Sequence, residues 1–207
     1  SQLLNGDILK NDSATLPEFL SIAGDYRMLL LATHGEANAR AGEYSWLAFT
    51  YLNDSINNDL LYAKDLYENP FAASLVVLSA CETGIGEYRE GEGVLSLARG
   101  FFYAGAQTII PTLWSVDDAR NSEIIQSFFK HLNESERVVD AMHQAKLDFL
   151  EARTHDEAHP VYWAAPIVIG LPEPDISVGR TPWVLLGGAF LLGFLILLFI
   201  RKYFKKI

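Results

Sequence analysis

A single thiol and one histidine could together support nucleophilic chemistry in this sequence. Cys81 is the only cysteine of the 207-residue chain, and it follows the apolar run Leu75–Leu78. His34 follows a second, largely apolar run, residues 27–33, and precedes Gly35. The thiolate is the reactive form of cysteine, and a neighbouring imidazole can take the thiol proton. Taken one at a time, Cys81 could equally be a small buried residue, and most lone histidines such as His34 are surface or core groups without a chemical role.

The two apolar runs are typical of strands that are buried on both faces of a mostly parallel sheet. Open α/β sheets place their ligand sites at the carboxyl edge, where each of these strands would end. His34 and Cys81 are 47 positions apart in the chain. If the two strands are neighbours, both side chains lie at the same edge, so the pattern predicts one site built from two residues.

Other elements are predicted from apolar periodicity and from the positions of Gly and Pro. Further strands are expected at residues 45–50, 107–112 and 161–170. Helices are expected at residues 17–24, 60–68, 94–105, 119–132 and 137–152. This order of strands and helices, joined by short loops, predicts an α/β layered domain with a mostly parallel central sheet.

Composition and motif spacing exclude several classes of function. The formal net charge is −10, and all 26 acidic residues precede the last seven residues. An acidic folded part argues against nucleic acid as the main partner, because phosphate binding needs a basic face. The glycines between residues 84 and 93 do not match the nucleotide-binding fingerprints. His155 and His159 are four apart, but Pro160 disfavours a helix there, so no metal site is expected. No cofactor is expected either.

A membrane anchor is predicted near the C-terminus. Residues 183–200 contain no charged side chain, and a helix of this length spans roughly 27 Å, close to the thickness of the hydrocarbon core. Trp183 and Tyr203 flank the run, where interfacial aromatic residues are typical. We therefore divide the chain into a folded domain (residues 1–172, core 27–170), a linker (173–182), a single-pass transmembrane helix (183–200) and a basic tail (201–207).

The charge bias predicts how this helix crosses the membrane. Four cations follow the apolar run, which favours a C-terminus inside the cell and a folded domain outside the cytoplasm. That topology needs an upstream signal sequence, and the start at Ser1 without methionine suggests the C-terminal piece of a longer protein. The alternative is a tail-anchored protein whose domain is cytoplasmic.

Five short motifs follow one another in a specific order. They lie at residues 32–35 (ATHG), 78–84 (LSACETG), 93–106, 113–118 (LWSVDD) and 159–164 (HPVYWA). This set resembles the CHAT domain, a family in the caspase/separase group of cysteine peptidases that often follows tetratricopeptide repeats. The resemblance runs from about Arg27 to Gly170. Val161 departs from it, because the family's last motif usually reads His-Pro-Tyr-Trp.

The resemblance implies a caspase-like three-layer sandwich and a role for each motif residue. His34 and Cys81 would form the catalytic dyad, and the backbone N–H groups of Gly35 and Cys81 the oxyanion hole. Asp117 or Asp118 would bind an Arg or Lys side chain before the scissile bond. Alternatively, one of these two carboxylates caps the helix expected to start at residue 119.

Two functions follow for the whole chain. The first is a membrane-anchored cysteine endopeptidase that cleaves protein substrates, with upstream tetratricopeptide repeats in the full-length protein. The second is a non-catalytic interaction or signalling module gated by those repeats. The presence of both His34 and Cys81 favours the enzyme.

Overall fold

The structure is a computed structural model, and it describes residues 6–36, 38, 41–51, 59–71, 73–79, 96–135, 137–174 and 176. Residues Ser1–Ile176 belong to one compact unit. Cys81, the predicted transmembrane segment 183–200 and the basic tail 201–207 lie outside the described residues, so the divisions proposed for that part of the chain stay predictions. Within the described ranges, no helix is long and apolar enough to cross a bilayer.

The centre of the domain is a four-stranded sheet. Its strands are β1 (Met28–Leu31), β5 (Leu75–Leu78), β6 (Thr108–Ile110) and β7 (Ile169–Gly170), in the order β1-β5-β6-β7. β5 pairs in parallel with both β1 and β6, whereas β7 runs antiparallel to β6 at the edge. The predicted α/β class with a mostly parallel central sheet is confirmed.

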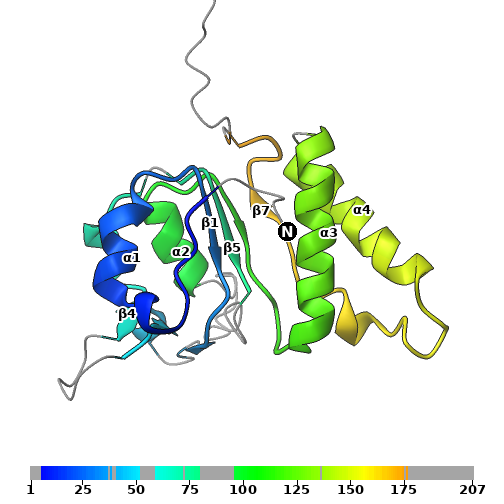
Figure 1. The fold of residues 1–207 in the computed structure, drawn as a ribbon, viewed down its shortest axis with the longest axis horizontal. Coiled ribbons are helices and arrows are strands. Elements are labelled where there is room, and N and C mark those ends of the chain that lie inside the picture. The colour runs from blue at the N-terminus through cyan, green and yellow to red at the C-terminus, as the bar shows by residue number, and fades with distance from the viewer. Residues whose placement is uncertain are drawn as a thin grey trace, which may run out of the picture. The chain divides into compact units, whose positions relative to one another are not determined.

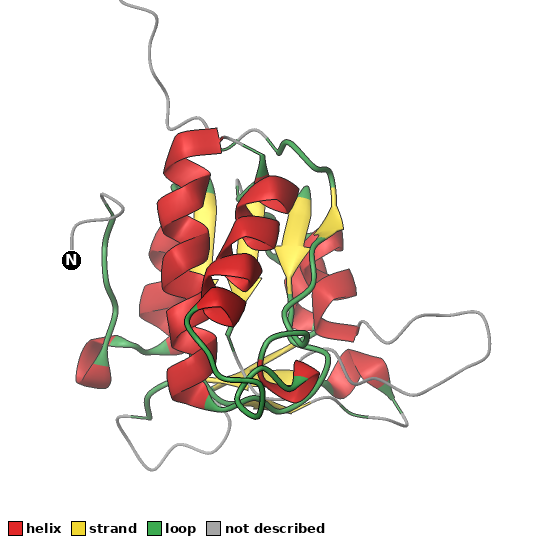
Figure 2. Cartoon of the chain, turned by 90° about the vertical axis from the view of Figure 1, so that its right-hand side faces the viewer, coloured by secondary structure: helices red, strands yellow, loops and turns green. Residues whose placement is uncertain are grey.

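Helices cover both faces of this sheet (Figure 1). The helices α1 (Leu16–Ala23) and α2 (Ser96–Tyr103) share one hydrophobic cluster with the sheet, and α3 (Asp118–Ser135) and α4 (Val138–Glu151) share the other. Figure 2 shows α3 and α4 side by side in front of the strands. The domain is therefore layered, with helix pairs on either side of the strands.

The sequence of β5 explains why it occupies the middle of the sheet. Each of its four residues is at most 1% exposed. Because side chains alternate across a strand, Val76 and Leu78 join the cluster of α1 and α2, and Leu75 and Val77 join that of α3 and α4. Burying each such side chain contributes about 1.5–3 kcal/mol. A charged residue anywhere in β5 would therefore disrupt one of the two cores.

A second, antiparallel sheet follows the carboxyl end of β1. It comprises β2 (Gly35–Glu36), β3 (Trp46–Ala48) and β4 (Leu60–Tyr62), in that order. Leu47 and Leu61 pair across β3 and β4, and both are buried in the cluster of α1 and α2. This small sheet therefore holds the chain that leaves β1 against the domain core.

A shared carboxylate joins α3 to α4 on the other face. Asp148 of α4 accepts a hydrogen bond from Ser127 Oγ at 2.6 Å, and its Oδ2 lies 2.7 Å from Nε2 of His131. The hydrogen bonds from Ser127 and His131 lower the pKa of Asp148. Around this contact the two helices bury the aromatic side chains Phe128 and Phe149. The helix pair predicted at residues 119–132 and 137–152 is thus confirmed.

The helix predicted over residues 60–68 is wrong in its first half. Residues Leu60–Tyr62 form β4, and only Asp65–Glu68 turns into a 3₁₀ helix. The reason is the partner strand, because Leu61 reaches a buried position by pairing with Leu47. Asp65 then accepts a hydrogen bond from the backbone N–H of Tyr62, which closes the turn. The other 3₁₀ segments are Asn11–Ser13, Gly42–Tyr44 and Pro160–Tyr162.

The strand predicted over residues 161–170 is also largely wrong. It contains part of a 3₁₀ helix, Pro160–Tyr162, and only the last two residues form β7. Prolines have no N–H for a strand ladder, and here they stand at positions 160 and 166. Pro166 forms only an isolated bridge with Thr112. The apolar residues of this segment therefore belong to a loop, from which they pack against the cluster of α3 and α4.

Gly170 is required by the backbone at the end of β7. Its φ is +117°, and a Cβ there would lie 2.2 Å from the carbonyl oxygen of Gln107. That same oxygen accepts the hydrogen bond of Leu171 N. We expect Gly170→Ala to lower the free energy of unfolding by about 2 kcal/mol or more, measured by chemical denaturation.

Gly24 provides the matched control for this prediction. It follows α1 with a φ of −65°, and a Cβ would meet no atom within 4 Å. Gly24→Ala should therefore leave stability unchanged or raise it by up to about 1 kcal/mol. Equal effects of the two substitutions would contradict the assignment of strain to Gly170.

Candidate active site

His34 is held by its backbone and exposed at its side chain. It stands three residues after the end of β1, and its carbonyl oxygen accepts a hydrogen bond from Ala48 N at 2.8 Å. The Thr33 hydroxyl donates to the carbonyl oxygen of the same Ala48. Ala48 of β3 thus holds the side chain of Thr33 and the backbone of His34. His34 itself is exposed to solvent.

Gly35 begins the small sheet directly after this histidine. It pairs with Leu47 in the antiparallel ladder of β2 and β3. Of the two backbone groups predicted for the oxyanion hole, Gly35 is therefore on a hydrogen-bonded strand, next to the candidate base. The other group, the N–H of Cys81, lies outside the described residues.

The pairing of β1 with β5 sets the spacing at this edge of the sheet. The register runs from Met28↔Leu75 to Leu31↔Leu78, an offset of 47 residues. Ser79 continues the pairing, because its N–H donates to the carbonyl oxygen of Leu31 at 2.9 Å. His34 and Cys81 are separated by the same 47 positions in the sequence. In the sequence, each comes three residues after the last residue of its strand, Leu31 for His34 and Leu78 for Cys81.

Asn121 is a buried polar residue at the same edge that sequence reasoning missed. It lies in the first turn of α3, is 2% exposed, and donates from Nδ2 to Ser79 Oγ at 2.9 Å. Its Oδ1 is buried and has no hydrogen-bond partner among the described residues. The available signal was a polar side chain in line with Ile124, Ile125 and Phe128 on the apolar face of the helix.

The two acidic residues of the 113–118 motif have different positions. Asp117 precedes α3, and its Oδ1 accepts a hydrogen bond from Arg120 N at 3.0 Å, which is an N-cap interaction. Asp118 is the first residue of the helix, and its side chain is exposed. Negative charge is favourable at a helix N-terminus for either residue. One carboxylate of the pair therefore has a clear structural role.

The last motif is connected to the segment before α3. Trp114 Nε1 donates to the carbonyl oxygen of Val161 at 2.9 Å, so the residue that departs from the family pattern accepts a hydrogen bond through its backbone. The guanidinium of Arg120 lies 3.6 Å from the ring centroid of Tyr162, a cation–π distance. The segments 113–120 and 159–163 thus form one structural unit.

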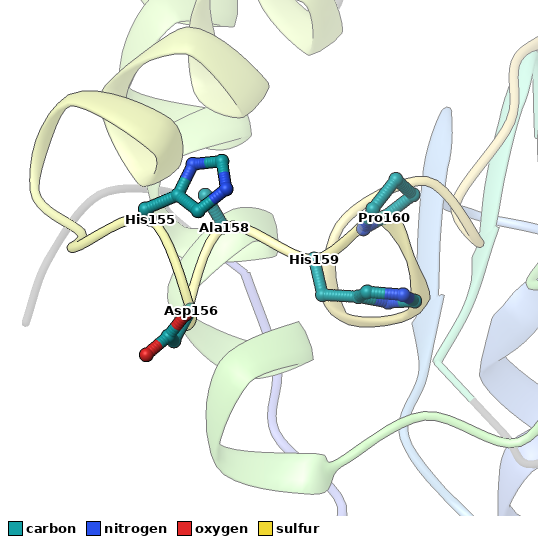
Figure 3. Close-up of a pocket in the computed structure, with 5 residues that line it drawn as sticks. All are labelled: His155, Asp156, Ala158, His159 and Pro160. Carbon is teal, nitrogen blue, oxygen red and sulfur yellow. The ribbon is translucent and has the colours of Figure 1, made fainter.

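The two histidines excluded as metal ligands line a shallow depression of about 330 Å³. Its walls also include Asp156, Ala158 and Pro160 (Figure 3). Figure 3 shows the carboxylate of Asp156 directed away from the rings of His155 and His159. The Nδ1 of His159 accepts a hydrogen bond from Val161 N, which assigns this ring to the local turn. In the part of the chain that the structure describes, no three His, Cys, Asp or Glu residues could hold a metal ion.

Comparisons with known proteins agree with the motif pattern. Tetratricopeptide repeat protein 28 of Mus musculus and that of Homo sapiens are each 29% identical to this chain over 125 residues. The aligned part is 58% of this chain and 5% of each relative, so the chain spans a small fraction of the curated relatives it matches. The family model of the CHAT domain matches residues 2–171. Because that match extends over more than half of the sequence, the chain belongs to the CHAT domain family of caspase-like cysteine peptidases.

Proposed function

We propose that this protein is an active cysteine endopeptidase with His34 and Cys81 as its catalytic dyad. The observation that carries the proposal is the register of β1 and β5, whose offset of 47 residues equals the separation of the two side chains in the sequence. Residues at equal distances beyond two paired parallel strands leave the sheet at the same edge. Membership of the family supports the same pair.

The proposed reaction begins with proton transfer from the Cys81 thiol to the His34 imidazole. The thiolate attacks the carbonyl carbon of the scissile peptide bond, and the tetrahedral oxyanion accepts hydrogen bonds from the backbone N–H groups of Gly35 and Cys81. The imidazolium then returns the proton to the departing amine, which leaves a thioester on the enzyme. Water activated by His34 hydrolyses this thioester and restores the thiol. The fixed backbone and exposed ring of His34 suit these proton transfers.

Substrate selection is proposed to rest on the acidic start of α3. Both carboxylates are exposed, but Asp117 already caps the helix, whereas Asp118 is not the capping residue. A carboxylate there suits a charge-assisted pair with an Arg or Lys side chain before the scissile bond. Of the two candidates, the hydrogen bonds favour Asp118 as the ligand.

The proposal also includes a membrane anchor at residues 183–200 and a longer native protein. The uncharged run supports a single-pass helix, and the four cations after it support a folded domain outside the cytoplasm. The names of the two relatives support upstream tetratricopeptide repeats, which sequencing of the upstream coding region would reveal. A protein substrate is proposed from the peptidase family.

The dyad is tested with the full chain in detergent micelles, a peptide library and sequencing of the cleavage sites. Cys81→Ala should abolish cleavage and labelling by a thiol-directed peptide electrophile, because the nucleophile is lost. Its thermal unfolding temperature should match that of the wild type, as a control for folding. Cleavage that persists in Cys81→Ala would overturn the proposal. A wild-type chain that cleaves nothing, alone or with its native upstream region, would favour the interaction module instead.

The specificity pocket is tested by comparing two charge-removing substitutions. Asp118→Asn should lower kcat/KM for substrates with Arg or Lys before the cleaved bond by about ten- to a hundredfold, since one charge-assisted hydrogen bond is lost. Asp117→Asn is the matched control, because asparagine caps a helix as well as aspartate. Equal losses in both variants, or cleavage after other residue types, would refute the assignment to Asp118.

The membrane proposal is tested in intact cells that carry a reporter fused to the native N-terminus. External protease should remove the reporter if the folded domain lies outside the cytoplasm. As a control, replacing Leu191 and Leu195 with Asp should release the protein from the membrane fraction, because charges are costly in the hydrocarbon core. A reporter that is protected until the cells are permeabilised would instead support the tail-anchored topology.

A further inference from the structure

The side-chain amide of Asn121 is buried in the first turn of α3. On the same face of α3, Ile124 and Ile125 lie one turn further along the helix and Phe128 two turns further, and all three are in the hydrophobic core. An amide at such a position is costly unless both of its polar atoms are hydrogen-bonded. Only Nδ2 has a partner among the described residues, the hydroxyl of Ser79. A residue chosen for packing alone would be apolar here.

Ser79 is the residue from which the chain leaves the central sheet toward Cys81. Its N–H is bound by Leu31 of β1 and its hydroxyl by Asn121 of α3, so strand and helix hold it from two sides. Two residues of chain reach at most about 7 Å. The position of Ser79 therefore limits where the thiol of Cys81 can lie relative to the end of β1.

Asn121 is itself fixed by the start of α3. Its backbone N–H donates to the carbonyl oxygen of Asp117 at 2.9 Å, and the Asp117 carboxylate caps the same turn. The helix turn that carries the proposed substrate carboxylate, Asp118, is thus joined through one side chain to the strand that leads to the proposed nucleophile.

We propose that Asn121 is a positioning residue, which holds Ser79 at the end of β5 and thereby limits where Cys81, two residues further along the chain, can lie relative to His34. This inference rests on the proposed function for the identity of the dyad. Asn121 touches neither substrate nor thiol in this role, and it acts through Ser79. The hydrogen bond between them connects positions 42 residues apart in the sequence.

The single cysteine makes the proposal directly measurable. In the full chain in detergent micelles, iodoacetamide alkylation followed by intact mass reports Cys81 alone. We expect Asn121→Leu and Ser79→Ala each to slow alkylation at neutral pH by about tenfold. This is the lower end of the effect of replacing a residue that orients a metal ligand through a hydrogen bond. The pH midpoint of alkylation should move up toward about 8.5, the value of an ordinary thiol. The double variant should be no slower than the slower single variant, since both remove one interaction.

The matched control is Gln126→Leu on the same helix. Gln126 also donates its side-chain amide to a serine, Ser122, but this pair is exposed. Its removal should leave the alkylation rate and its pH midpoint unchanged. If Asn121→Leu does not fold, Ser79→Ala removes the same hydrogen bond from the strand side and leaves the helix intact.

The outcomes separate this inference from the proposed function. Folded variants that alkylate with the rate and pH midpoint of the wild type would overturn the positioning role, even if the wild type cleaves peptides. A wild type that cleaves nothing, together with slower alkylation in both variants, would sink the peptidase and retain the positioning role. A general loss of stability would change the unfolding temperature but not the pH midpoint of the folded protein.

Discussion

The parallel pairing of β1 with β5 is the interaction on which the rest of the molecule depends. Both candidate catalytic residues follow these strands, and the backbone ladder determines which residues of one strand stand beside which of the other. The two cores keep this pairing in place, since alternate side chains of β5 belong to opposite clusters. The ladder and its two helical layers thus form a rigid base for whatever lies at its carboxyl edge.

Around this edge, single hydrogen bonds hold the chain in place, rather than long strands or helices. His34 is held through Ala48 of β3, Ser79 through Asn121 of α3, and the start of α3 through Asp117. Trp114 and Val161 then join the loop before α3 to the last motif. Each contact involves a backbone group or a single side chain, and all but the local Asp117 cap connect segments that are distant in the sequence. Motif residues that look separate in the chain therefore belong to one structural unit.

Sequence patterns predicted the elements whose secondary structure depends on their own residues alone. The apolar run of β5 and the long periodic helices α3 and α4 needed no knowledge of distant partners. Leu60–Tyr62 became a strand only because β3 lies beside it, so local periodicity suggested a helix instead. Asn121 was missed for a similar reason, because its significance comes from a serine 42 residues earlier. The family resemblance rests on the order of short motifs, and this order can be read from the sequence without knowledge of contacts between distant residues.

The register of β1 and β5 also determines which changes in chain length the molecule can tolerate. Between the two strands lie the small sheet and its loops, and residues added to those connections leave the pairing of Leu31 with Leu78 unaltered. A residue added within β5 has a different effect, because it shifts the pairing by one and moves every following side chain to the opposite face. Length variation among related chains should therefore collect between the strands, while the three-residue steps from Leu31 to His34 and from Leu78 to Cys81 stay constant. The separation of 47 residues between His34 and Cys81 is thus particular to this chain. What the proposed dyad requires is that both residues follow their strands by the same number of positions.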